Sequence, residues 1–262
     1  MSHPEQLAFF RLCADANRDL TASANVLEIG SYDVNGSVRA MFSTAGQYCG
    51  VDLVDGPGVD RIGYGHEVDD LDGSWDIALS AECFEHDPHW RATLANMVRL
   101  TRPGGLVVVS CASTGRVEHG TRRTTVIDSP GTQFEGLDYY CNVTAAQVSA
   151  LPVDEWFSAH QLVYNATSFD LYLVGVRAGT SHADQAQASL PALSSLHGLT
   201  RIMTPQQRLV RLPLRILSRV LRRQSAYQRV AIPYWLTVIG TFRSIDRVTA
   251  AVRRLTSASH PR

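Results

Sequence analysis

The sequence predicts an α/β fold built around a doubly wound, mostly parallel sheet, with a helical C-terminal extension. Three observations predict it. A short apolar run at residues 26–29 ends at Gly30, a second candidate strand at residues 47–52 ends in an acid, and two further buried-type strands lie at residues 75–80 and 106–110. Apolar strands separated by helical and turn-rich segments are typical of such a sheet.

The first predicted strand delivers a tight turn at its carboxyl end. Gly30 lets the backbone approach a ligand closely, and Gly36 can serve the turn before the next helix. Glu28 precedes the turn, and a carboxylate there suits a cationic or hydroxyl-bearing ligand better than a phosphate. The spacing is not G-x-G-x-x-G and the chain has no G-x-x-x-x-G-K, so the usual dinucleotide and P-loop sites are not favoured.

The sequence patterns after the glycine turn predict a second strand, a helix and a later strand. The second strand ends at Asp52, about twenty residues after the glycine turn, where an acid can accept both hydroxyls of a ribose. Residues 91–100 are amphipathic with helical spacing, and the Arg-Pro-Gly-Gly sequence at residues 102–105 breaks that helix before the strand at residues 106–110. Because open α/β sheets bind ligands at the carboxyl ends of their strands, we expect the site there.

Four blocks of the sequence, in this order, resemble class I S-adenosylmethionine-dependent methyltransferases. They are residues 26–30 (VLEIG), 50–52 (GVD), 76–86 (DIALSAECFEH) and 100–109 (LTRPGGLVVV). The resemblance implies a Rossmann-like sheet of seven strands in a domain of residues 1–178, closed by a hairpin with strands at residues 158–164 and 169–176, the last one antiparallel. Many members carry a glycine where Asp33 stands, so this sequence departs from the family in the glycine turn.

The resemblance also implies S-adenosylmethionine as the cofactor and a set of residues that hold it. By this resemblance the methionine part is cradled by Glu28, Gly30 and Ser31, the ribose by Asp52, and the adenine by Glu67 and Val68, with further cofactor contacts at Gly36, Leu53, Ser80 and Ala81.

The amino-acid composition narrows the class of protein to which the chain can belong. With 262 residues, 45% of them hydrophobic and 19% charged, the chain can build a sizeable core in one domain plus an extension. Its five cysteines form no C-x-x-C pair, so we expect reduced thiols in a cytoplasmic protein rather than a disulfide frame or a zinc site built on cysteines. The amino terminus has no signal-peptide pattern. The chain has no lysine, which excludes Schiff-base chemistry and a P-loop lysine.

Charge divides the chain sharply. Residues 201–262 hold 13 Arg and one acid, a net +12, whereas the rest of the chain holds 11 Arg and 24 acids, a net −13. The basic extension predicts amphipathic helices, disturbed at Pro213, and its apolar run at residues 230–242 is too short to span a membrane. Residues 179–200, rich in Ala, Ser and Gly, predict a linker or a mobile lid.

Three interpretations of the basic extension stay open. An arginine face can dock on the acidic domain, within one chain or across a homodimer. The extension can instead bind anionic lipid headgroups as a peripheral membrane segment. Nucleic-acid binding is electrostatically allowed, but no aromatic and basic platform favours it, so it is the least favoured partner.

We expect methyl transfer to a hydroxyl of a sugar or oligosaccharide, as in polysaccharide or glycolipid biosynthesis. Such a reaction needs an oriented acceptor and removal of its proton. Two polar loops after strands, residues 82–89 and 115–142, offer the groups, and their acids, arginines and tyrosines suit a hydroxyl-rich acceptor. In style, though without a diagnostic motif, the chain also resembles methyltransferases of actinobacterial glycan pathways.

His119 is the first candidate for the general base, because a neutral imidazole can take a proton near pH 7. Glu85 and His86 form a pair that many family members share, for which a scaffold role at the helix start stands beside a catalytic one. Tyr139 can stack on a sugar ring or cover the cofactor. A Mg²⁺ ion is left open, and its candidate oxygen ligands are Glu82, Glu85, Asp87, Asp128 and Asp138.

Two alternatives to sugar methylation stay open. One is an O- or N-methyltransferase of a lipid or an aromatic small molecule, with the apolar extension near the acceptor. The other is a non-catalytic protein that binds S-adenosylmethionine, which would keep the cofactor residues but show no turnover.

Overall fold

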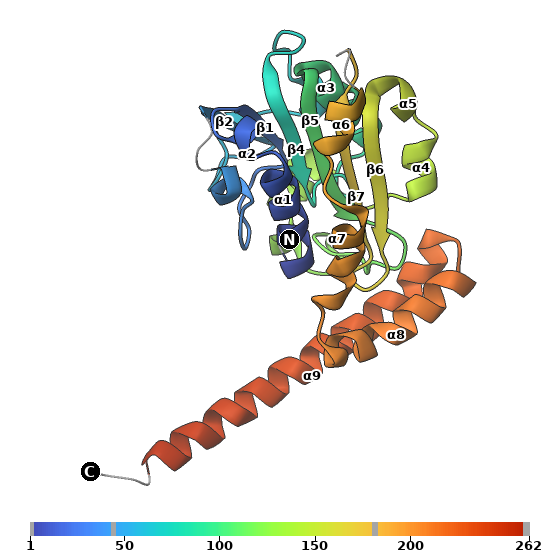
Figure 1. The fold of residues 1–262 in the computed structure, drawn as a ribbon. Coiled ribbons are helices and arrows are strands. Elements are labelled where there is room, and N and C mark those ends of the chain that lie inside the picture. Colours follow the sequence, from blue (N-terminus) through green and yellow to red (C-terminus); the bar gives the residue numbers. More distant parts are fainter. Residues whose placement is uncertain (1–2, 43–45, 180–182, 259–262) are drawn as a thin grey trace.

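The computed structural model describes residues 3–42, 46–179 and 183–258, and a seven-stranded sheet forms its centre (Figure 1). The strands are β1 (Asn25–Ile29), β2 (Gln47–Asp52), β3 (Arg61–Ile62), β4 (Trp75–Ala81), β5 (Thr101–Ala112), β6 (Phe157–Asn165) and β7 (Asp170–Arg177). Their order is β3-β2-β1-β4-β5-β7-β6. Strands β1 to β5 run parallel, and β7 is antiparallel to both β5 and β6. The predicted seven-stranded, mostly parallel sheet with a closing antiparallel hairpin is therefore confirmed.

Helices cover both faces of the sheet, which makes the fold doubly wound as predicted. They are α1 (Pro4–Ala16), α2 (Arg18–Thr21), α3 (Trp90–Leu100), α4 (Ala145–Ser149), α5 (Val153–Trp156), α6 (Ala183–Ala188), α7 (Leu193–Gly198), α8 (Pro205–Val220) and α9 (Gln224–Ala258). One buried cluster packs α1, α6 and α7 on one face, and another packs α3, α4 and α5 on the other. In β5, Val108 belongs to the first cluster and Val107 to the second, which explains the continuous apolar run of this strand.

The Arg-Pro-Gly-Gly sequence at residues 102–105 breaks the helix, as predicted, and also opens the next strand. Thr101 already pairs with Trp75, and the register then shifts before Ile77 pairs with Leu106. A bulge absorbs the residues between these pairs. Gly105 permits it, because a Cβ there would lie 2.5 Å from the carbonyl oxygen of Asp76.

Residues 183–199, most of the range predicted as a linker or lid, contain the short helices α6 and α7 and pack on the sheet. Ala186, Leu190, Leu196 and Leu199 are buried in the same cluster as α1. The segment therefore contributes to the core of the domain. The division of the chain at residues 178 and 200 stays a prediction.

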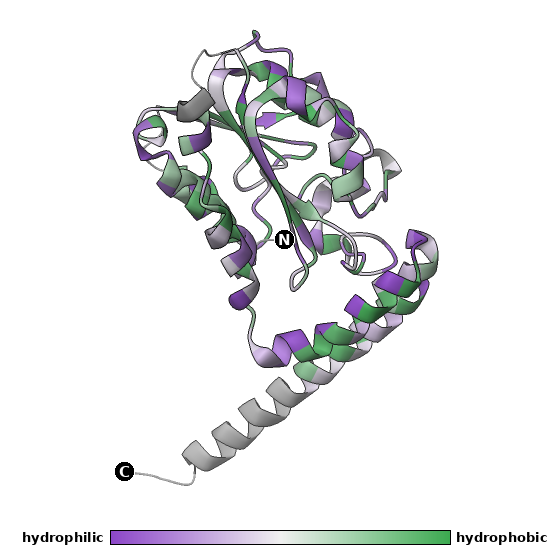
Figure 2. Cartoon of the chain, turned by 45° about the vertical axis from the view of Figure 1, so that its right-hand side comes forward, coloured by the Kyte–Doolittle hydropathy of each residue, from purple (hydrophilic) through white to green (hydrophobic). Residues whose placement is uncertain are grey.

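The C-terminal helices α8 and α9 lie side by side at one end of the domain (Figure 1). Hydrophilic and hydrophobic residues alternate along α8 and along the part of α9 that lies beside it (Figure 2). Val117 and Phe169, from loops beside β5 and β7, pack with Leu214, Tyr227 and Ala231 of the two helices. Among the described side chains, the extension thus docks on its own domain through an apolar surface and not through an arginine face, which was one of the three interpretations of the sequence. Among the described residues, none of the helices combines the length and apolar character that a membrane span needs.

Hydrogen bonds from α9 fix the loop that follows β5. Tyr227 donates its hydroxyl proton to the carbonyl oxygen of Gly115 (2.6 Å). The side-chain amide of Gln228 donates to the carbonyl of Arg116 (2.9 Å) and accepts from the backbone N–H of Glu118 (2.9 Å). Because α9 makes these contacts near its start, the loop after β5 is clamped between the sheet and the extension.

A buried ionic network lies beneath this loop. Asp170 accepts from Arg116 (3.1 Å), and its other oxygen lies 3.1 Å from Nε2 of His3. His3 Nδ1 lies 3.1 Å from a carboxylate oxygen of Glu5. Burial by itself lowers the pKa of His3, but the Asp170 and Glu5 carboxylates outweigh it and raise the pKa to about 9. The amino-terminal residues are therefore tied electrostatically to the start of β7.

We expect His3 to stabilise the protein in a pH-dependent way. Its pKa rises on folding from 6.5 to about 9, so its contribution is complete below 6.5 and is lost as the pH rises through about 9. The variant His3→Gln should lose up to about 3 kcal/mol of unfolding free energy near pH 6 and much less near pH 10. Denaturant unfolding at both pH values measures this difference, with His160→Gln on β6 as the control. An equal loss of unfolding free energy at both pH values would contradict the pairing of protonated His3 with Asp170.

Candidate functional site

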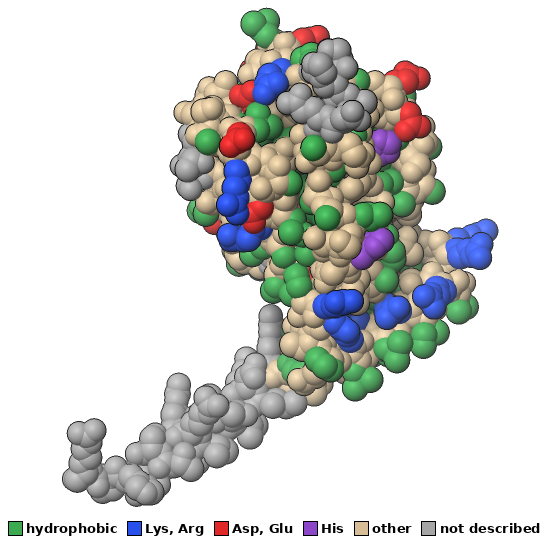
Figure 3. Space-filling view, in the orientation of Figure 1, with side chains coloured by type: hydrophobic (Ala, Val, Ile, Leu, Met, Phe, Trp, Pro, Cys, Tyr) green, Lys and Arg blue, Asp and Glu red, His purple; other side chains and the backbone are tan. Residues whose placement is uncertain are grey.

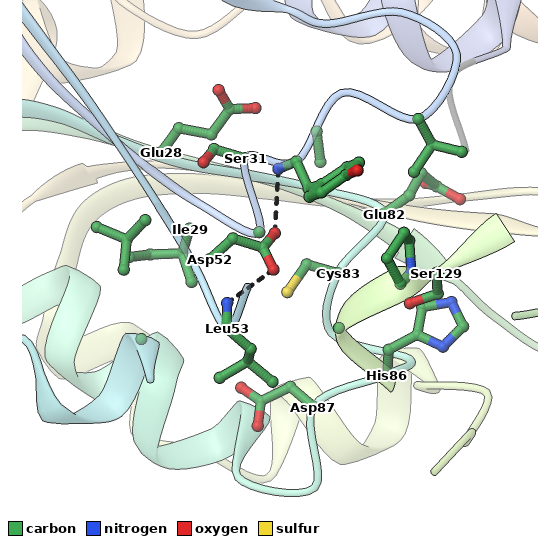
Figure 4. A pocket seen from close by; sticks show the side chains of 18 of the residues that line it. Glu28, Ile29, Ser31, Asp52, Leu53, Glu82, Cys83, His86, Asp87 and Ser129 are labelled. Atoms are coloured by element: carbon green, nitrogen blue, oxygen red, sulfur yellow. Dashed lines mark hydrogen bonds between the residues drawn. The ribbon is translucent and has the colours of Figure 1, made fainter. Parts of the chain in front are cut away.

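A cleft of about 980 Å³, partly open to solvent, lies at the carboxyl ends of β1, β2 and β4. The strand order reverses between β1 and β4, and open α/β sheets bind ligands at such a switch point. Figure 4 shows Asp52 and Cys83 near the centre of the cleft and His86 at its side. The predicted site residues that line it are Glu28, Gly30, Ser31, Gly36, Asp52, Leu53, Ala81 and His86.

The glycine turn after β1 is required by close packing. Gly30 has φ +79°, a conformation that favours glycine, and its N–H donates to the carbonyl of Val51 (2.8 Å). A Cβ at Gly30 would overlap the Cβ of Cys83 and lie 2.5 Å from its Sγ. The turn after β1 and the segment after β4 therefore touch at the floor of the cleft. Cys83 was not predicted as a site residue, because nothing in its local pattern marks it.

Asp52 presents a carboxylate that is already ordered by the backbone. Its two oxygens accept from the N–H groups of Tyr32 (3.0 Å) and Leu53 (2.7 Å) (Figure 4). Burial raises the pKa of Asp52, and the backbone hydrogen bonds offset part of this shift. A carboxylate oxygen has lone pairs to spare beyond one backbone contact, so Asp52 can still accept from the hydroxyls of a ligand.

Glu28 and Ser31 add two buried polar groups to the cleft. Glu28 is only 3% exposed and accepts from the hydroxyl of Tyr48 (2.6 Å). Burial raises the pKa of Glu28 to about 8, although the Tyr48 hydrogen bond lowers it in part. The Ser31 hydroxyl is buried without a hydrogen-bond partner among the described residues. Both groups can pair with a polar ligand.

Three predicted cofactor residues do not line the cleft. The Ser80 hydroxyl donates to the carbonyl of Ile29 (2.9 Å) and links β4 to β1. Val68 is buried in the core beneath α3, and Glu67 is exposed. Where these two were expected beside the adenine, the neighbouring residues Gly63, Tyr64 and Gly65 line the cleft instead.

The loop after β5 covers the cleft from the opposite side. Its residues 128–132 line the cleft. A Cβ at Gly131 would lie 3.1 Å from a carboxylate oxygen of Asp52, so this loop closely approaches the second strand. Sequence reasoning had singled out Asp128 as polar but missed Ser129 to Thr132, since an irregular loop has no periodicity to indicate which residues face a ligand.

Of the predicted catalytic residues, only His86 lines the cleft. Glu85 is fully buried beside it, and His119 is buried behind it, with its ring centroid 5.1 Å from that of His86. Tyr139 is half-buried, and burial together with Cys141 raises its pKa to about 12. The catalytic assignments of these residues stay predictions, and the geometry brings together Glu85, His86 and His119.

The carboxylates considered for Mg²⁺ do not converge. Asp87 accepts from the N–H of His89 and the hydroxyl of Thr93 and so starts α3. Glu82 accepts from the Ser110 hydroxyl (3.0 Å), and Asp138 from the N–H of Arg122 (2.9 Å). Within the described part of the chain, the ligand groups that do converge are His3–Glu82–Asp170 and Glu85–His86–His119. Neither is a cage of oxygens, which Mg²⁺ prefers.

Comparison with known proteins agrees with this geometry. Residues 5–124 match the family model described as a methyltransferase domain. The matched segment contains β1, β2 and β4, at whose carboxyl ends the cleft lies. No curated protein sequence matches the chain.

Solved structures resemble the chain at low identity. The 1,6-didemethyltoxoflavin-N1-methyltransferase of Burkholderia thailandensis is 21% identical, with a TM-score of 0.45 over 66% of this chain and 79% of its own. The YcgJ protein of Bacillus subtilis is 12% identical, with a TM-score of 0.45 over 65% and 99%. The phosphoethanolamine N-methyltransferase 2 of Haemonchus contortus is 14% identical, with a TM-score of 0.45 over 62% and 53%. Identities and TM-scores this low do not indicate which acceptor this chain uses.

We expect the glycine turn to tolerate no side chain. Gly30→Ala places a Cβ into Cys83 and forces a left-handed conformation, so it should cost at least about 1–3 kcal/mol of unfolding free energy. Gly63→Ala is the matched control, because Gly63 lines the same cleft and a Cβ there meets nothing within 4 Å. Denaturant unfolding of both variants measures the difference. Equal stability of the two would show that the turn is not constrained as described.

Proposed function

We propose that the chain is an S-adenosylmethionine-dependent O-methyltransferase that acts on a hydroxyl of a sugar or oligosaccharide, in the assembly of a polysaccharide or glycolipid. One observation carries the proposal: the cleft contains a carboxylate that can accept hydrogen bonds from ribose hydroxyls, and polar side chains of the loop after β5 line it as well. Asp52 stands on one side, and Asp128, Ser129 and Thr132 line the other. A hydroxyl-rich acceptor matches such hydroxyl and carboxylate groups.

The residues of the cleft fit S-adenosylmethionine. Asp52 can accept from the ribose hydroxyls, and the buried, unpartnered hydroxyl of Ser31 can pair with the methionine part. A cationic amino group of the cofactor would favour the ionised form of Glu28, whose carboxyl is otherwise disfavoured as an anion by burial. The cofactor supplies the methyl group and its leaving group, so the protein has to orient the acceptor and accept its proton.

The acceptor side of the cleft is formed by the segment after β4 and the loop after β5. Burial lowers the pKa of His86 to about 3, so its ring is neutral at physiological pH and can accept a hydrogen bond from a hydroxyl. The same burial makes His86 a weak base when it acts alone. His119, the first candidate for the base, lies behind His86 and can reach an acceptor only through it or through a group bound between them.

The proposal predicts transfer of labelled methyl from S-adenosylmethionine to members of a panel of mono- and oligosaccharides. Asp52→Asn removes one acceptor charge and should weaken cofactor binding by about 10–100-fold, as loss of a hydrogen bond to a charged group does. Asp55→Asn, an exposed neighbour outside the cleft, is the matched control. Calorimetry with S-adenosylhomocysteine measures the affinity.

Each outcome of this experiment decides between the candidate functions. If the chain binds the cofactor and methylates lipid or aromatic acceptors but no sugar, the acceptor is a lipid or an aromatic molecule and the sugar proposal is wrong. Cofactor binding with no turnover on any acceptor would indicate a non-catalytic binding protein. Equal affinity of Asp52→Asn and Asp55→Asn would remove Asp52 from the cofactor site.

The outer face of α8 supports a second proposal, contact with an anionic membrane surface. Leu209, Leu212, Ile216 and Val220 recur at helical spacing and are exposed, by 67% at Leu209 and 72% at Val220. Arginines run beside this stripe, and Figure 3 shows the row of basic side chains above the hydrophobic ones. Apolar residues flanked by arginines are typical of interfacial helices that bind anionic headgroups. A lipid-linked sugar would combine both proposals.

We expect the full chain to bind vesicles that contain phosphatidylglycerol and not vesicles of phosphatidylcholine alone. The double variant Leu209→Glu and Ile216→Glu should weaken binding at least about 10-fold, since it puts two anions into the apolar stripe. Leu71→Glu is the control, because Leu71 is 82% exposed on a loop before β4, far from α8 in the sequence. Co-sedimentation measures the binding. Binding that is indifferent to lipid charge, or unchanged by the double variant, would contradict the proposal.

A further inference from the structure

We propose that Glu85, His86 and His119 form a binding site for a divalent transition metal of the zinc class. Each side chain offers one ligand atom, and the three atoms lie within 4.8 Å of one another. Nε2 of His119 lies 3.7 Å from Oε1 of Glu85. Ligands bound to one tetrahedral zinc ion at about 2.1 Å are roughly 3.4 Å apart, so the cluster needs only a small contraction to close on a metal.

The hydrogen bonding of His119 shows which of its atoms faces the cluster. Its Nδ1 lies 3.1 Å from the carbonyl oxygen of Val117, so Nδ1 carries the proton and donates it. Nε2 is then a bare lone pair, and it is buried without a hydrogen-bond partner among the described residues. A backbone carbonyl that fixes the tautomer of a histidine in this way is typical of metal-binding histidines.

Glu85 faces this lone pair with two more acceptor atoms. Both of its carboxylate oxygens are buried and make no hydrogen bond of normal geometry within the described part of the chain. An ionised carboxylate and a bare imidazole nitrogen 3.7 Å apart repel each other unless a proton or a metal cation lies between them.

His86 completes the set and connects it to the cleft. Its ring is perpendicular to that of His119, and neither ring nitrogen makes a hydrogen bond of normal geometry, although the Tyr139 backbone interacts weakly with it. The ring nitrogens of both histidines that lack a partner are buried, and a neutral imidazole is the form that binds metal. Two imidazoles and one carboxylate favour zinc, cobalt, nickel or iron over Mg²⁺.

In the second converging cluster, His3–Glu82–Asp170, the buried carboxylates are paired with positive side chains of the protein. Arg116 supplies its central cation at 3.1 Å from Asp170 and 3.8 Å from Glu82. Protonated His3 supplies a second positive charge. No comparable cation from the described residues contacts the Glu85 carboxylate, because Arg116 points to the other pair. The two clusters lie next to each other, and among the described residues only His3–Glu82–Asp170 has a cation in contact with its carboxylates.

A metal at this place would have an open coordination position toward the cleft, because only His86 of the three ligands lines it. Three protein ligands with a free fourth position are typical of metal sites that bind a water or a substrate oxygen. Resting on the proposed function, we infer that this position receives the acceptor hydroxyl and lowers its pKa. The hydroxyl proton would pass to water in the partly open cleft as the oxygen takes the methyl group from the sulfonium of the cofactor.

The test uses the full chain, freed of metal by dialysis against EDTA, with Zn²⁺ and Co²⁺ as probes. Calorimetry should show a single Zn²⁺ site, and bound Co²⁺ should show the visible absorption of a nitrogen- and oxygen-ligated ion. Glu85→Gln and His119→Gln keep the size of each side chain but remove a ligand. Each should weaken Zn²⁺ binding by more than the 10–100-fold that loss of an outer partner typically causes. His160→Gln should bind as the wild type does.

Folding of the variants is checked by thermal unfolding without metal. Added Zn²⁺ should raise the unfolding midpoint of the wild type and of His160→Gln, but not of the two ligand variants. If Glu85→Gln does not fold, His86→Gln, which changes the half-buried ligand, takes its place. No Zn²⁺ binding by the wild type, or equal affinity in the wild type and the ligand variants, would overturn the proposal. Because the readout is metal binding, its outcome is independent of whether a sugar is methylated.

Discussion

The buried ion pair between Arg116 and Asp170 is the interaction on which the arrangement of the site depends. Asp170 begins β7 and is fully buried, and Arg116 lies in the loop after β5, with 3.1 Å between the charged atoms. Taking two charges out of water costs several kcal/mol per ion unless hydrogen bonds complete the pair. Here Arg116 also donates to the carbonyl of Ser168, and the Tyr172 hydroxyl donates to Asp170. Moving either residue away would leave the other as an unpaired buried charge. The ion pair therefore fixes the position of the loop after β5 relative to the sheet.

The same constraint explains how segments far apart in the chain meet at the histidine cluster. Glu82 has φ +58°, a left-handed conformation that costs energy in a residue with a side chain, and it is held by hydrogen bonds to the backbone and hydroxyl of Ser110. This turn directs Glu85 and His86 toward the loop that Arg116 anchors and that carries His119. On its other side, Gln228 of α9 bonds the same loop. The strain at Glu82 is thus compensated by contacts from β5, and the cluster depends on three separate segments.

The parts of the fold that were predictable from sequence are those with a local cause. The apolar runs of the strands, Gly30 at its turn and Asp52 at the end of β2 all follow from patterns of a few residues, and the structure shows them in the expected places. The cofactor contact of Ser80 stays a prediction, because a resemblance transfers a position without the direction of its side chain, and here the Ser80 hydroxyl donates to the carbonyl of Ile29. The meeting of Glu85 with His119 has no local signal at all, because it is set by the buried ion pair and by α9. In α8, periodicity indicated an amphipathic helix, but it could not show which apolar stripe docks on the domain and which stays exposed.

The position of α8 and α9 connects the charge asymmetry of the chain to its cleft. Val117 and Phe169, which contact these helices, lie in loops at the same end of the sheet as the carboxyl ends of the parallel strands (Figure 1). Residues 1–200 carry a net −13 and would be repelled by an anionic surface, whereas residues 201–262 carry a net +12 and would be attracted to it. A chain with this dipole approaches such a surface with its extension first. Because the cleft opens at that same end, the proposed membrane contact would also bring the cleft close to the surface, where a sugar linked to a lipid could reach it without leaving the membrane.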